Sequence, residues 1–193
     1  ADFVLCAAMN PCACGLYPAP KCKCTPLQIS RYLGRIPGPL MDRIDLTVEV
    51  KAASLNELSG KGHQTGESSA QIRARVEKAR AIQRKRFEGT PYRYNSQIQS
   101  RDITDFCRLG EDETVWMKKI YDTRGMSMRT YHKILKVART IADLNGDDRI
   151  TIDALHEAVF YKPCDQSYWN SGDKMQTDRR IDRYSMKKKG RKV

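Results

Sequence analysis

The chain has 193 residues, of which 30% are charged and 8% aromatic, and this is the composition of an ordinary soluble globular protein. No apolar run approaches the roughly 18 residues that a membrane span needs, and no basic leader precedes the apolar start, so the sequence favours a cytoplasmic protein without a membrane partner. The formal net charge of +12 favours anionic partners, nucleic acid above all.

The first predicted element is a buried parallel strand over residues 3–9. These residues form a continuous apolar run that ends at the turn signal Asn10-Pro11. The chain opens directly in this run and lacks an initiator Met. We therefore interpret it as a piece of a longer protein, cut close to the start of a core strand.

Four of the seven cysteines lie within thirteen residues and form a CxC-x7-CxC cluster: Cys12, Cys14, Cys22 and Cys24. Without a signal peptide, metal binding is favoured over a disulfide framework. Four thiolates suit tetrahedral Zn²⁺ in a closed, structural site. Two alternatives stay open, namely four reduced thiols in a flexible loop and an iron–sulfur cluster. We interpret the other three cysteines as core or incidental thiols.

A half-buried strand is predicted over residues 44–50, where apolar and polar side chains alternate at every step. A short helix is expected over residues 27–33, and a loop over residues 34–39, which hold two prolines and two glycines. Residues 1–55 are thus predicted to be an α/β fragment with a cysteine-rich insertion, and residues 56–67 a linker.

An all-helical module is predicted over residues 68–161. Its first helix, residues 68–87, begins with the capping-box pair Ser68 and Gln71 and carries a basic surface outside one apolar stripe. Further helices are expected over residues 100–109, 112–123, 127–144 and 151–161. The third of these has the clearest apolar stripe and is expected to stop at Asn145-Gly146. The basic tail, residues 162–193, is predicted to be disordered.

Three polar side chains stand where phosphate chemistry could use them. Asn10 ends the first predicted strand, a position where ligands bind in open α/β sheets, although turn formation explains it equally simply. Arg43 precedes the second predicted strand and offers a rigid fork for phosphate oxygens, unless it only pairs with a neighbouring aspartate. Arg129 lies just after the expected cap Ser127, where a cation opposes the helix dipole and a bound anion would relieve the conflict; the alternative is a solvated surface arginine.

Four blocks occur in order along the chain: AAMNPCACG at residues 7–15, GPLMDRIDL at 38–46, GESS at 66–69 and SMRTYHKILKVARTIADL at 127–144. Together they resemble the magnesium-chelatase-like AAA+ proteins of the ComM/YifB type. The resemblance runs from about residue 1 to residue 161, and the remaining tail matches no pattern of the family. Two residues depart from the family pattern, Ala13 and Pro37, and neither removes a proposed ligand or phosphate contact.

This resemblance implies the fold and the roles of single residues. It implies the C-terminal part of an AAA+ α/β core followed by a helical lid. It identifies Asn10 with sensor 1, Arg43 with the arginine finger and Arg129 with the sensor 2 arginine. The motifs that hold ATP and Mg²⁺ would lie upstream of this chain, so the chain by itself should hydrolyse nothing. The resemblance further implies a homo-oligomeric, hexameric ring that acts on DNA in branch migration during natural transformation.

Two other functions remain open at this stage. A zinc-stabilised nucleic-acid-binding module without catalysis would use the cysteine cluster, the basic helix and the net charge. A magnesium chelatase ATPase subunit would require a tetrapyrrole partner.

Overall fold

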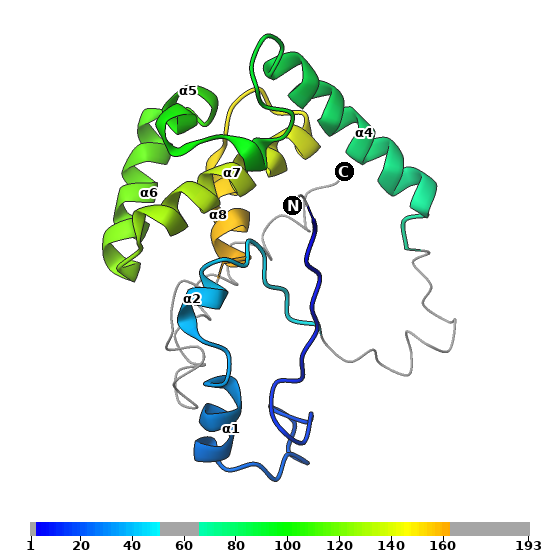
Figure 1. Ribbon diagram of the computed structural model, residues 1–193, viewed down its shortest axis with the longest axis vertical. Coiled ribbons are helices and arrows are strands. Elements are labelled where there is room, and N and C mark those ends of the chain that lie inside the picture. Colours follow the sequence, from blue (N-terminus) through cyan, green and yellow to red (C-terminus); the bar gives the residue numbers. More distant parts are fainter. Residues whose placement is uncertain (1–2, 51–65, 163–193) are drawn as a thin grey trace, which may run out of the picture. The chain divides into compact units, whose positions relative to one another are not determined.

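The computed structural model describes residues 3–50 and 66–162, and within these ranges its regular structure is entirely helical (Figure 1). The described chain divides into two compact units, residues 3–43 and residues 44–162 without 51–65. Most of the predicted linker and all but the first residue of the predicted tail lie outside the described residues, as does Cys164. No helix in the described ranges combines the length and apolarity needed to cross a bilayer.

The smaller unit contains two short helices, α1 (Pro26–Leu33) and α2 (Gly38–Met41). The predicted helix over residues 27–33 is confirmed, and Thr25 and Gln28 form its capping box. The predicted loop over residues 34–39 ends earlier than expected. Gly38 and Pro39 already belong to α2, because proline fits the first turn of a helix, where its missing N–H has no partner to lose.

The larger unit is a bundle of helices. In chain order it contains α4 (Ser69–Arg86), η1 (Asn95–Gln97), η2 (Ser100–Asp102), α5 (Ile103–Phe106), α6 (Glu111–Arg124), α7 (Met128–Asn145) and α8 (Ile152–Phe160). The predicted helices over residues 68–87, 112–123, 127–144 and 151–161 are confirmed. The helix predicted over residues 100–109 is instead a 3₁₀ turn followed by the single turn of α5.

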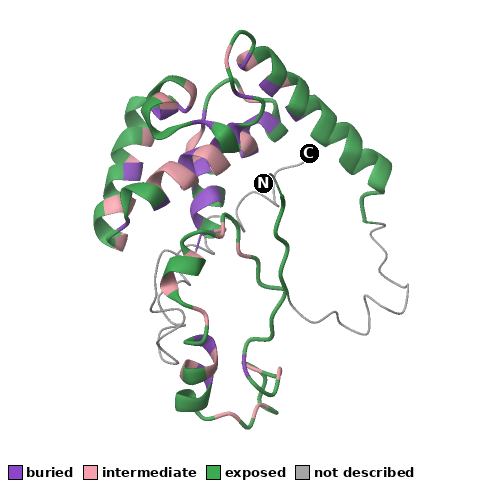
Figure 2. Ribbon diagram, viewed as in Figure 1, coloured by how far each residue is buried: buried purple, intermediate pink, exposed green. Residues whose placement is uncertain are grey.

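Helix α7 is the centre of this bundle and packs against α4, α5 and α8. Its N-cap is Ser127, whose side chain accepts a hydrogen bond from the Thr130 N–H, and its C-cap is Gly146, which adopts a φ of 80°. Its predicted stripe is buried, with Ile134 and Ala138 almost inaccessible to solvent. Figure 2 shows the buried residues concentrated along α7 and α8. Burial of this stripe stabilises a helix that would be marginal alone in water.

Only the second half of α4 takes part in the core. Residues 66–78 are all exposed, and the first buried side chains of the helix are Ala79 and Gln83 (Figure 2). The apolar stripe expected on this helix is therefore only partly used, since Ile72 is 43% and Val76 38% exposed.

Residues 44–47 are attached to the helical unit by three contacts. The Thr47 N–H donates to the Tyr161 carbonyl at 2.8 Å, and the Lys162 ammonium donates to the Ile44 carbonyl at 2.6 Å. Lys133 of α7 forms an ion pair with Asp45 at 2.7 Å. This segment thus follows the end of α8 and the side of α7, although it lies far from both in the sequence.

The α/β fragment predicted for residues 1–55 is not confirmed. Neither residues 3–9 nor residues 44–50 form a strand, and no strand occurs elsewhere in the described ranges. The physical reason is that a strand exists only with a neighbour that accepts its N–H groups and donates to its carbonyls. Without one, the apolar side chains of both segments face solvent: Val4 is 95% exposed and Val50 89%.

Candidate metal centre and phosphate-contact residues

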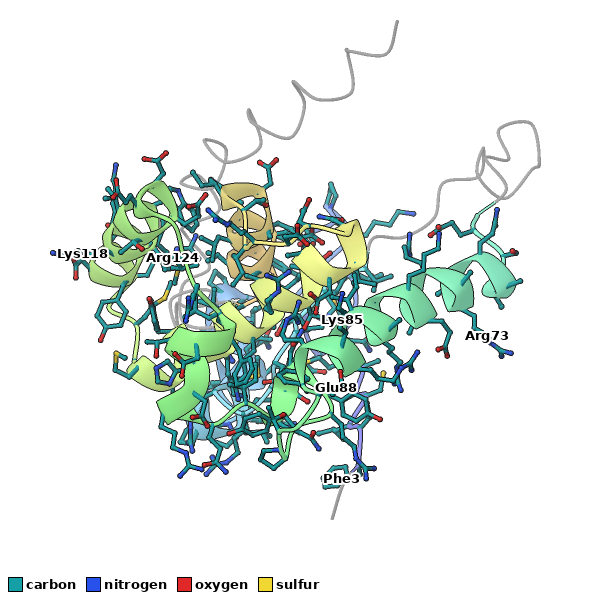
Figure 3. All side chains as sticks on the ribbon, turned by 90° about the horizontal axis from the view of Figure 1, so that it is seen from above. Phe3, Arg73, Lys85, Glu88, Lys118 and Arg124 are labelled. Atoms are coloured by element: carbon teal, nitrogen blue, oxygen red, sulfur yellow. The ribbon has the colours of Figure 1, made fainter. Side chains whose placement is uncertain are left out.

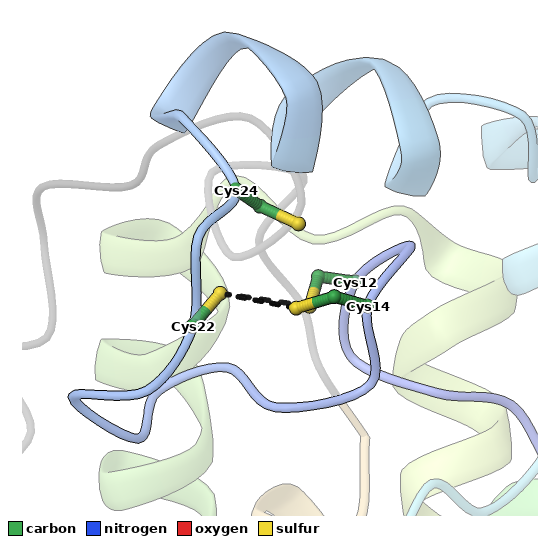
Figure 4. Close-up of side chains that lie close together, drawn as sticks. All are labelled: Cys12, Cys14, Cys22 and Cys24. Carbon is green, nitrogen blue, oxygen red and sulfur yellow. Dashed lines mark hydrogen bonds between the residues drawn. The ribbon is translucent and has the colours of Figure 1, made fainter.

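The structure brings the four clustered cysteines together, as the sequence predicts (Figure 4). All four sulfur atoms lie within 4.8 Å of one another. The Cys12 sulfur lies 3.4 Å from that of Cys14 and 3.8 Å from that of Cys22, and the Cys14 and Cys22 sulfurs are 3.5 Å apart. With metal–sulfur bonds of about 2.3 Å, the sulfurs of a tetrahedral zinc site are about 3.8 Å apart. The four side chains therefore fit a metal such as zinc.

Tight turns produce this arrangement. The Gly15 N–H donates to the Cys12 carbonyl at 3.0 Å, and Gly15 adopts a φ of 78°, which a side chain would strain. Two further turns fold the gap between the cysteine pairs, through hydrogen bonds from Ala19 to Leu16 and from Cys22 to Ala19. The second pair then leads directly into the capped start of α1.

The pKa values of the thiols show why a cation suits this cluster. Burial acts to raise the pKa of Cys12, but hydrogen bonds from the Tyr17 backbone and from Cys14 outweigh it and lower the pKa to about 6. At Cys22 the backbone N–H of Cys24 acts to lower the pKa, yet burial and the adjacent sulfurs of Cys14 and Cys12 raise it to about 12. One thiolate thus opposes the ionisation of its neighbour, and a divalent metal removes that opposition.

The cysteine cluster also lies at the centre of the few buried residues of the smaller unit. The buried apolar residues of the smaller unit are Cys12, Ile29 and Leu33, with the half-buried Tyr17 and Tyr32 packed around them. A core of this size cannot offset the ordering of some forty residues, and small domains in this position commonly use a metal.

Asn10 and Arg43 both belong to the smaller unit and both are exposed. The amide of Asn10 lies beside the backbone of Gly15, in contact range of the turn that carries the first cysteine pair. Arg43 follows α2, and its guanidinium donates to the Pro39 carbonyl at 2.7 Å. Asp45, one of the two carboxylates that could have paired with Arg43, pairs instead with Lys133.

Arg129 belongs to the helical unit, in the first turn of α7. It is exposed, and within the described ranges its side chain has no ion pair or hydrogen bond. The cap at Ser127 occupies the Thr130 N–H and leaves this arginine outside the capping contacts.

A buried charged network in the helical unit is absent from the sequence predictions. The carboxylate of Asp143 is fully buried and accepts hydrogen bonds from Arg86, Asn95 and Arg139. Arg86 belongs to the basic surface that the sequence predicts outside the apolar stripe of its helix, yet in the structure its guanidinium contacts this buried carboxylate. A signal was present, because Asp143 lies four residues after Arg139 on the buried side of the strongest apolar stripe, where a lone charge requires a partner.

Comparison with known families gives matches over most of the chain. Residues 66–162 match the family model of the magnesium chelatase subunit ChlI C-terminal domain, and residues 1–58 match the model of magnesium chelatase, subunit ChlI. The boundary between the two matched ranges falls in the segment that the structure leaves undescribed.

Individual relatives match over the same region. The chain is 41% identical over 162 residues to the competence protein ComM of Haemophilus influenzae, which covers 84% of this chain and 31% of that protein. It is 41% identical over 166 residues to YifB of Escherichia coli, covering 86% of this chain and 32% of YifB, and 39% identical over 166 residues to YifB of Salmonella typhimurium, with the same coverage. The chain thus spans about a third of the length of the curated relatives it matches.

Proposed function

The chain belongs to the magnesium chelatase ChlI-type family of AAA+ ATPases, and on that premise we propose that it is the C-terminal part of a ring-forming motor that couples ATP hydrolysis to the remodelling of DNA. In this proposal Asn10 acts as sensor 1, Arg43 as the arginine finger and Arg129 as sensor 2. In this proposal, the loop that would hold ATP and Mg²⁺ lies in the part of the relatives' length that this chain does not span, about two thirds of it.

The observation that carries the proposal is that Arg129 lies exposed in the first turn of α7 without an ion pair to any described residue. A guanidinium in the first turn of a helix opposes the helix dipole at a cost of about 0.3–1 kcal/mol. The described residues offer no carboxylate that compensates for this cost. A nucleotide γ-phosphate at this helix start would accept hydrogen bonds from the guanidinium and complement the dipole at once.

Arg43 has the accessibility that an arginine finger requires. Its side chain is exposed at the end of α2, and its contact with the Pro39 carbonyl holds one side of the guanidinium. A finger contacts the nucleotide of an adjacent subunit, so this role entails a homo-oligomer, which we propose to be a hexameric ring.

The two extended apolar segments support an AAA+ core that is completed by further chain. Residues 3–9 and 44–50 expose apolar side chains that a sheet would cover, and Asn10 and Arg43 adjoin them. Strands supplied by the rest of a longer protein would pair with both segments and bury those side chains.

DNA as the substrate is supported by charge. The exposed first half of α4 and its continuation carry six exposed basic side chains: Arg73, Arg75, Lys78, Arg80, Arg84 and Lys85. Figure 3 shows Arg73 near one end of this helix and Lys85 near the other. Such a helix can neutralise backbone phosphates without reading sequence, as a motor on DNA must.

The test is to restore the full-length protein and to substitute Arg43→Ala and Arg129→Ala separately. We expect the rate of ATP hydrolysis to fall by roughly 10³-fold or more for Arg43→Ala, the variant of the proposed finger. The free energy of unfolding of each variant should stay within about 0.5 kcal/mol of that of the parent. Arg93→Ala is the matched control, because Arg93 is an exposed arginine of the helical unit outside the proposed site. Hydrolysis within about threefold of the parent for both variants contradicts the proposal.

A mixing experiment tests the finger across the subunit interface. Arg43→Ala subunits and subunits with a disabled phosphate loop are each expected to be inactive as homo-oligomers. Mixed rings contain some interfaces with one intact finger and one intact loop, so combining the two preparations should restore part of the hydrolysis. If mixing restores no hydrolysis, Arg43 either contacts the nucleotide of its own subunit or takes no part in hydrolysis.

A second candidate function is a zinc-stabilised nucleic-acid-binding module without catalysis. The observation in its favour is the cysteine cluster, which adjoins Lys21 and Lys23 and two arginines of α1 and its end, Arg31 and Arg35. Under this function, neither Arg43→Ala nor Arg129→Ala would change ATP hydrolysis by the full-length protein, whereas loss of the cysteine cluster would weaken nucleic-acid binding.

A further inference from the structure

A cluster of arginines lines a pocket of the helical unit, and Arg129 is not among the residues of that lining. The pocket has a volume of about 470 Å³ and lies among α4, the segment from α5 to α6, and the turn after α7. Its charged lining consists of Arg86, Arg108, Arg139, Arg149, Asp105 and Asp148. This volume is within the range of small-ligand sites.

The floor of the pocket carries positive charge that its own carboxylate does not balance. Arg139 is only 4% exposed, and it shares the buried Asp143 with Arg86. Arg139 also donates to the carbonyls of Asp148 at 2.9 Å and Asp147 at 2.6 Å. Two guanidinium groups are thus fixed in place around one carboxylate, so this part of the pocket carries more positive than negative charge.

The rim of the pocket carries two guanidinium groups that form no ion pair or hydrogen bond with the described residues. Arg108 and Arg149 are exposed, and neither has an ion pair or hydrogen bond to another residue in the described ranges. Asp105 and Asp148 line the same pocket without pairing with them. Counting Asp143 beneath the floor, the four guanidinium groups outnumber the three carboxylates.

We propose that this pocket binds a phosphate group, with Arg108 and Arg149 contacting the phosphate oxygens and Arg86 and Arg139 forming a fixed positive floor. A guanidinium fork matches two phosphate oxygens, and two forks at one pocket favour a dianionic group over a carboxylate. The phosphate comes from a free nucleotide or from a nucleic-acid backbone, and both sources share this chemistry. The lining of the pocket includes none of the residues proposed for ATP hydrolysis, and the proposal does not depend on their roles.

The experiment follows the arginine side-chain N–H signals of the ¹⁵N-labelled chain by NMR while pyrophosphate is added at constant ionic strength. We expect saturable shifts at Arg108 and Arg149 and a smaller shift at Arg86. The double variant Arg108→Ala with Arg149→Ala should bind pyrophosphate roughly tenfold more weakly or worse, since each removes a charge-assisted hydrogen bond. The matched control, Lys118→Ala with Lys119→Ala, removes the same charge from an exposed face outside the pocket (Lys118 is labelled in Figure 3).

Two outcomes overturn the proposal: linear, unsaturable shifts in the parent, or equal weakening in the pocket and control variants, which would indicate general charge attraction. Competition distinguishes the two sources. A short single-stranded oligonucleotide that displaces pyrophosphate from the pocket assigns it to a nucleic-acid backbone, and a nucleoside monophosphate that displaces it when the oligonucleotide does not assigns it to a free nucleotide.

Discussion

The two units of the chain reach stability by different means. The helical unit buries 17 residues in one continuous core, from Phe87 to Val159, around α7. The smaller unit buries three, and one of these is a cysteine of the cluster. The same chain uses apolar burial where its segments are long and periodic, and it brings together four thiols that could hold a metal where turns and prolines prevent a core.

The largest expected effect comes from removing the metal. Zinc should copurify at about one ion per chain, and Cys22→Ser or a strong chelator should unfold the smaller unit while the helical unit keeps its structure. Structural zinc contributes an apparent free energy of about 10–16 kcal/mol in small domains, far more than three buried residues supply. Metal analysis and NMR spectra of both units provide the measurement.

Cys6→Ser is the control for this experiment, because Cys6 is exposed and lies outside the cluster. If the chelator leaves the signals of α1 unchanged, the smaller unit does not depend on metal, and the comparison between the two units fails.

The next largest effect is expected in the helical unit. Asp143→Ala leaves the guanidinium groups of Arg86 and Arg139 without their shared carboxylate, and breaking a buried ion pair in this way costs about 3–5 kcal/mol. Urea unfolding followed by circular dichroism measures the loss, and the zinc content should not change.

Asp122→Ala is the matched control, since Asp122 is an exposed aspartate of α6. Its free energy of unfolding should differ from that of the parent by no more than about 0.5 kcal/mol. A similar, small cost for both variants would show that the buried network contributes nothing to the unit beyond its apolar core.

The smallest expected effect comes from removing a helix cap, and the same type of cap occurs in both units. Thr25 and Ser68 each form a capping box, at α1 and α4. Thr25→Ala should weaken zinc binding several-fold, because a cap contributes about 0.5–2 kcal/mol and α1 follows directly after Cys24. Ser68→Ala should leave global unfolding unchanged, since residues 66–78 are exposed and can fray without opening the core.

Competitive titration with a zinc chelator and urea unfolding measure the two effects. An equal effect of both substitutions on global unfolding would mean that the first half of α4 is part of the cooperative core.

Local signals were enough to predict the longer helices and the convergence of the four cysteines. Ser127 and Gly146 mark both ends of α7 through cap chemistry, and its apolar stripe determines which face is buried. The CxC pairs and the glycine between them likewise predict convergence of four sulfurs. Each of these features depends on residues close together in the sequence.

Features that depend on distant partners could not be predicted in the same way. The alternation over residues 44–50 is a genuine strand pattern, but a strand forms only with neighbours that this chain's described residues do not supply. Arg86 looks like any solvated arginine until Asp143, 57 residues later, is placed beside it. The pairing of Lys162 with the Ile44 carbonyl spans 118 residues and carries no local signature.

The attachment of residues 44–47 to the helical unit has a mechanical consequence. Because Lys162, Tyr161 and Lys133 hold this segment, a rotation of the helical bundle displaces the backbone at Ile44. Arg43 is the residue immediately before Ile44, and one planar peptide group joins the two. A movement of the helical unit that carries Ile44 with it therefore also displaces the Cα of Arg43.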